Sequence, residues 1–182
     1  MLFGTMKKQL LVFALLVSMA AAPVWAAEKN PLYEQLSRQR EVKICVAPPV
    51  DNGATNLDPE VFRKAVEEAL KNRKSIHFTV VASEAEAQFV VETGIKGFVF
   101  SLTDPVDMLA GVGMAAMDAA KIDHFASIDA EMAVREASGP VRWKDTIHAS
   151  LTEETMSEAE ARERIPARCA EVFVRTAFGK NK

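Results

Sequence analysis

The chain has 182 residues, with 25 acidic and 22 basic side chains and a net charge of −3 at pH 7. This length supports one domain with a buried core, and the negative charge gives no electrostatic reason to bind nucleic acid. No Walker loop, GxSxG, HExxH or Cys-x-x-Cys motif occurs, so the sequence predicts neither an enzyme nor a cofactor.

The first 26 residues have the pattern of a secretory signal peptide. Lys7 and Lys8 precede an uncharged apolar run over 10–22, and Ala26 supplies a small residue at the cleavage point. The run is too short to span a bilayer stably. We therefore expect cleavage after Ala26 and a single periplasmic α+β domain over 27–182, with an uncleaved N-terminal anchor as the alternative. The residue directly after the cleavage point is Ala27 rather than a cysteine, so no lipid attachment is expected.

Residues 27–40 are polar and predict a loose lead-in or a short helix. Residues 41–47 alternate apolar and polar side chains, which predicts a strand. Pro48, Pro49 and Gly53 break regular structure over the next stretch. A helix is then expected from Asp58, a natural N-cap followed by Pro59 in the first turn.

Residues 75–82 and 88–102 predict two further strands, the second with a bulge at Gly94 and Gly97, where its alternation slips. Residues 125–136 and 141–151 predict an antiparallel hairpin, because a reversal at Ser138-Gly139 places apolar residues opposite each other, for example Val134 opposite Trp143.

The C-terminal region is expected to be helical. Ser157 and Glu160 form a capping-box pattern. Pro166 is expected to divide the region into a short helix and a longer one.

The predicted order is strand, helix, strand, strand, insert, strand, strand, helix. This order indicates an α+β fold with a single, mostly antiparallel sheet of about five strands and helices packed on one face.

Several short motifs stand in this order: "VKICVAPPVDNG", then "FVVETGIKGFV", then "SGPVRWKDTI" before the terminal helix. With the amphipathic helix between them they resemble a group of bacterial envelope domains, which includes CsgG-like proteins, LpoB-like activators and the N-terminal domain of TolB. The resemblance implies a non-enzymatic accessory or assembly role, sometimes as a ring. Such proteins are often lipoproteins, whereas this chain lacks the lipobox cysteine.

An insert over 104–121 is rich in Gly, Ala and Met and carries little charge. It could pack on its own sheet, contact sister subunits or a partner protein, or touch a membrane surface. An exposed apolar patch would favour the last two. The candidate contact residues are Met108, Leu109, Gly111, Val112, Gly113, Met114 and Met117. We therefore expect an envelope assembly or partner-binding module.

The alternative function is a periplasmic carrier of a small ligand or metal. Asp129 and His148 are predicted cross-strand neighbours that could hold a metal or form a surface ion pair. A second set, Met108, Met114, Met117 and His124, offers soft ligands of the kind that copper prefers, although Met more often fills apolar gaps.

Cys45 and Cys169 could form one disulfide in an exported chain, or be two buried thiols. Asp145 lies by alternation on the core side, opposite Met132. A buried carboxylate there would need a hydrogen-bond partner, a raised pKa or a place at the sheet edge. It is therefore a candidate buried polar site.

Overall fold

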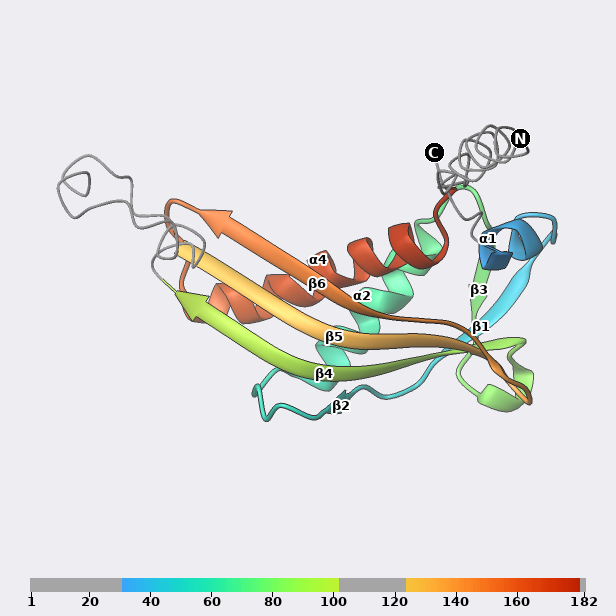
Figure 1. Cartoon of the computed structure of the whole chain (residues 1–182), viewed down its shortest axis with the longest axis horizontal. Helices are drawn as coiled ribbons and strands as arrows, with labels where there is room; N and C mark the ends of the chain where they lie inside the picture. The colour runs from blue at the N-terminus through green and yellow to red at the C-terminus, as the bar shows by residue number, and fades with distance from the viewer. Residues whose placement is uncertain (1–30, 102–123, 181–182) are drawn as a thin grey trace, which may run out of the picture. The chain divides into compact units, whose positions relative to one another are not determined.

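The computed structural model describes residues 31–101 and 124–180 (Figure 1). The elements in chain order are α1 (Pro31–Leu36), β1 (Val42–Val46), β2 (Val50–Asp51), α2 (Pro59–Lys71), β3 (Phe78–Val80), the 3-10 turn η1 (Glu84–Glu86), β4 (Phe89–Ser101), β5 (His124–Glu136), β6 (Val141–Glu153) and α4 (Glu158–Ala177). The predicted α+β class is confirmed.

The sheet is mostly antiparallel, as predicted, and it is mixed because its short strands pair in parallel. Its order is β3-β1-β4-β5-β6, with β2 pairing beside β1 on β4. The β4-β5-β6 ladders are antiparallel, but β1 is parallel to both of its neighbours and β2 is parallel to β4. Val80 and Phe89 both pair with Ile44. Strand β4 therefore begins level with the end of β3. The short connection that contains η1 crosses β1 and so places β3 on one side of β1 and β4 on the other.

From His124 to Val134 the register of β5 and β6 is the one predicted from sequence, and it shifts at Arg135, which pairs with Val141 and leaves Arg142 as an extra residue. Val134 pairs with Trp143, and Ala130 pairs with Ile147. The predicted slip in β4 is confirmed as well: the register shifts between Ile95 and Gly97, which leaves Lys96 as the extra residue. Such a bulge increases the local twist of the strand.

Both long helices lie on the same side of the sheet (Figure 1). Helix α2 buries Phe62, Val66 and Leu70, as its apolar spacing predicts. Helix α4 buries Phe173, whose ring lies 5.5 Å from that of Trp143 in β6. The core is therefore a single layer between the two helices and one face of the sheet, and the other face of the long strands carries mainly polar side chains.

Helix α4 runs without a break over 20 residues, so the expected division at Pro166 is wrong. The capping box of Ser157 and Glu160 is confirmed. Pro166 lies inside the helix, next to Ile165, and both are buried. A proline in a helix interior costs about 3 kcal/mol, and burial of this apolar stripe offsets that cost.

Candidate functional site

Asp129 and His148 are brought together on the polar face of the sheet. The distance from His148 Nδ1 to Asp129 Oδ1 is 2.8 Å, and the two side chains are 62% and 54% exposed. Glu131, which lies diagonally across from His148 on the same face, forms ion pairs with Lys96 and Lys144 instead. Hydrogen bonds from Lys144 and then Lys96 lower its pKa to about 2.

Nothing in this arrangement completes a metal site. Across residues 31–101 and 124–180, no group of three His, Cys, Asp or Glu side chains could hold a metal ion. Asp129 and His148 therefore form an exposed hydrogen-bonded contact, which is an ion pair only when His148 is protonated, and such surface pairs contribute little to stability.

The two cysteines are free, buried thiols, which is the second of the two alternatives that the sequence left open. Ile44 and Val46 of β1 belong to the core beneath the helices, as does Cys169 of α4. Cys45 stands between those two strand residues, so by alternation it points to the other face of the sheet. The sheet itself separates the two sulfur atoms. Burial raises the pKa of Cys169 to about 12 and also raises the pKa of Cys45.

Because the thiolate is the reactive form, we expect neither cysteine to react readily in the folded protein at about pH 8, well below the raised pKa of Cys169. Titration with a thiol reagent should detect almost no thiol in the native protein and both thiols in guanidinium chloride without reductant. Absence of titratable thiol under denaturing conditions would mean that the bridge exists.

Asp145 lies opposite Met132, as predicted, but it is exposed, so the expectation of a buried carboxylate is wrong. Strand β6 is the outer strand of the described sheet, and this edge position leaves the carboxylate in water. Its Oδ1 accepts a hydrogen bond of 2.8 Å from the backbone N–H of Thr146.

The Gly/Ala/Met residues Met108 to Met117 lie outside the described residues, but the place where the insert joins the sheet is described. Ser101 of β4 pairs with Phe125 of β5. A small apolar cluster lies at this end of the sheet, formed by Ala126, Met156 and Ala161 with Phe98, Phe100 and Leu151. Val99, which by alternation points to the opposite face of the sheet, is 50% exposed. The insert thus leaves from, and returns to, an apolar end of the sheet.

His124, the described member of the copper set, begins β5. Its ring lies 6.0 Å from that of Phe100, and its Nδ1 is buried without a hydrogen-bond partner among the described residues. The three methionines of this set lie outside the described residues, so the copper site stays a prediction.

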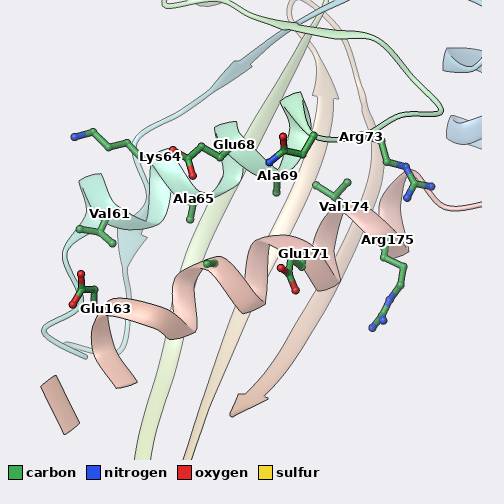
Figure 2. Close-up of a pocket in the computed structure, with 12 residues that line it drawn as sticks. Val61, Lys64, Ala65, Glu68, Ala69, Arg73, Glu163, Glu171, Val174 and Arg175 are labelled. Carbon is green, nitrogen blue, oxygen red and sulfur yellow. The ribbon is translucent and has the colours of Figure 1, made fainter. Parts of the chain in front are cut away.

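A groove between α2 and α4 was missed by the sequence reasoning (Figure 2). It encloses about 530 Å³. Ala65, Ala69 and Val174 lie between the helices. The charged residues around them are Lys64, Glu68, Arg73, Glu163, Glu171 and Arg175. Ala65 and Ala69 lie beside the buried stripe of α2, and their pattern alone does not distinguish a groove from the edge of that stripe. Among the described residues, no Ser, Cys or His lines the groove.

No helix in the described part of the chain is long and apolar enough to cross a membrane.

No known protein family matches the chain by its sequence profile, and no curated protein matches it. Solved structures with a similar fold include the PelC dodecamer from Paraburkholderia phytofirmans (12% identity, 74% of this chain and 89% of that chain, TM-score 0.47). They also include protein XCC0632 from Xanthomonas campestris (11% identity, 76% and 83%, TM-score 0.47) and a protein named as a lipoprotein from Caulobacter crescentus CB15 (13% identity, 81% and 92%, TM-score 0.40). At these identities and TM-scores the likeness carries no function to this chain. The resemblance to CsgG-like, LpoB-like and TolB domains stays a prediction.

Proposed function

We propose that this chain is an exported, non-enzymatic module of the bacterial envelope, and that it binds a partner protein or further copies of itself through segment 104–121. The N-terminal pattern of residues 1–26 supports export. The observation that carries the proposal is the way in which the segment is inserted between two paired strands.

Strands β4 and β5 pair up to Ser101 and Phe125. Residues paired across an antiparallel ladder are about 5 Å apart, so a turn of about two to five residues would join these strands. The chain uses residues 102–123 for the connection instead. Long connections inside compact domains are uncommon and usually serve a function.

The composition of the segment fits macromolecular contact. No charged residue occurs from Met108 to Met117. Methionine adapts to irregular apolar surfaces, and Gly111 and Gly113 permit close approach of another backbone. Protein contact is the occupant that we propose. Peripheral contact with a membrane surface is the competing outcome of the test.

The test replaces residues 104–121 by Asn-Gly, which forms a tight hairpin turn. Because the β4-β5 ladder stays complete, circular dichroism and the melting temperature should change little. Self-association measured by light scattering, or capture of a specific envelope protein by the tagged chain, should be lost. Met114→Glu in the full chain should weaken the same contact, whereas Val99→Glu, a change at an exposed apolar residue outside the segment, should not.

The proposal fails if the shortened, folded chain forms the same oligomer and captures the same proteins as the full chain. It also fails if the full chain is a monomer that binds no envelope protein and instead sediments with phospholipid vesicles through the same segment.

A further inference from the structure

The outer edge of β6 is a long row of backbone groups. Strand β6 has 13 residues, and β5 is its only strand neighbour in the described sheet. An edge strand of this length presents N–H and C=O groups that can pair with a strand of another chain. Natural sheets restrict such pairing with charged side chains on the edge strand.

Thr146 shows which backbone groups face outward. Its N–H donates to the Oδ1 of Asp145 over 2.8 Å and so does not bond to β5. Because inward and outward groups alternate in an antiparallel pair, the N–H groups of His148 and Ser150 also face the free edge. Asp145 therefore occupies one of the donors that an added strand would use.

The side chains of β6 are otherwise well suited to pairing. The row on the helix side contains Trp143, Ile147, Ala149 and Leu151, and Asp145 is its one charged member before Glu153. Trp143 and Leu151 are partly buried. β-branched and aromatic residues favour pairing. Without Asp145, this row would be a continuous apolar stripe on an open edge.

We propose that Asp145 keeps the free edge of β6 from pairing with β6 of a second copy of this chain. The second copy is the relevant partner because the apolar row is self-complementary. Antiparallel pairing about Ile147 would place Trp143 opposite Leu151 and would let Thr146 bond to His148 of the other copy. The same register would set each Asp145 opposite Ala149, in an apolar seam.

A carboxylate in such a seam would lose water without gaining a cation, which is costly. Two copies related by this symmetry would also bring two carboxylates near the centre of the seam. The inference concerns a surface other than segment 104–121, so it does not depend on the proposed function.

The test is the substitution Asp145→Thr in the full chain, which removes the charge and inserts a good strand former. Light scattering over a range of concentrations should show a mass rising toward twice the wild-type value. The double change Asp145→Thr with Thr146→Pro should restore the wild-type mass, because proline removes an outward N–H and is tolerated at a sheet edge. Asp129→Thr removes the same charge from central strand β5 and should leave the mass unchanged.

An Asp145→Thr protein with the wild-type mass would overturn the proposal, and so would association that survives Thr146→Pro or that Asp129→Thr reproduces. Hydrogen exchange of the wild type gives a second measurement that needs no variant. The amides of His148 and Ser150 should exchange rapidly, and strong protection at these positions would show that the edge is already paired.

Discussion

Replacing Phe173 by alanine is expected to lower the free energy of unfolding by about 3–5 kcal/mol, the range for deleting a buried aromatic ring. Phe173 is fully buried in α4. Its ring lies 5.5 Å from that of Trp143 and 5.6 Å from that of Phe178, so the change removes an aromatic contact between the terminal helix and the outer strand of the sheet. Urea denaturation followed by circular dichroism measures the loss.

Glu171→Ala is the matched control, because Glu171 is an exposed residue of the same helix. Its effect should stay within about 0.5 kcal/mol, as for most surface substitutions. A loss below about 1 kcal/mol for Phe173→Ala would contradict the single core between helices and sheet, since a cavity of this kind cannot be created so cheaply in a packed interior.

The hairpin of β5 and β6 could be predicted from the sequence because each strand must place its apolar side chains on one face. One face must be apolar along both, so Val134 can stand only opposite a residue such as Trp143, and a shift by one residue would expose both rows. The bulge in β4 was predictable for the same reason, since the alternation changes phase near Gly97.

The alternation of apolar and polar residues determines neither whether a strand runs parallel or antiparallel to its neighbour nor whether a given side chain is buried or exposed to water. The pattern of β1 predicts a strand but not its parallel pairing with β3 and β4, which follows from the short crossing at η1. Asp145 was placed on the correct face, yet that face is open to water at the sheet edge. Similarly, Pro166 indicates that a helix is locally unfavourable in free energy, but the sequence does not show the burial of the surrounding stripe that offsets this cost.

Of the candidate site, the sequence predicted the contact between Asp129 and His148 and the place where segment 104–121 joins the sheet. The groove between α2 and α4 could not be predicted, because it depends on how two helices far apart in sequence approach each other. The small residues that line it have no periodicity that distinguishes them from the edge of a buried stripe.

Replacing Gly53 by alanine is expected to lower the free energy of unfolding by about 1–3 kcal/mol, as for overpacked sites. A Cβ at this position would lie 2.2 Å from the carbonyl oxygen of Lys96, the extra residue of the β4 bulge. The segment cannot move away without loss. The N–H of Asn52 donates to the carbonyl of Ile95 over 2.8 Å, and the carboxylate of Asp51 accepts from the N–H groups of Gly53 and Thr55.

The bulge supplies its own control, because a Cβ on Gly97 would meet no atom within 4 Å. Gly97→Ala should therefore leave stability within about 0.5 kcal/mol or raise it slightly, by restricting the unfolded chain. Both variants are compared by urea denaturation, with hydrogen exchange of the Asn52 amide as a local measurement. Faster exchange should follow from Gly53→Ala alone. Equal losses in the two variants would mean that the bulge tolerates neither side chain, and that the contact of Gly53 with Lys96 does not decide the position of β2 on β4.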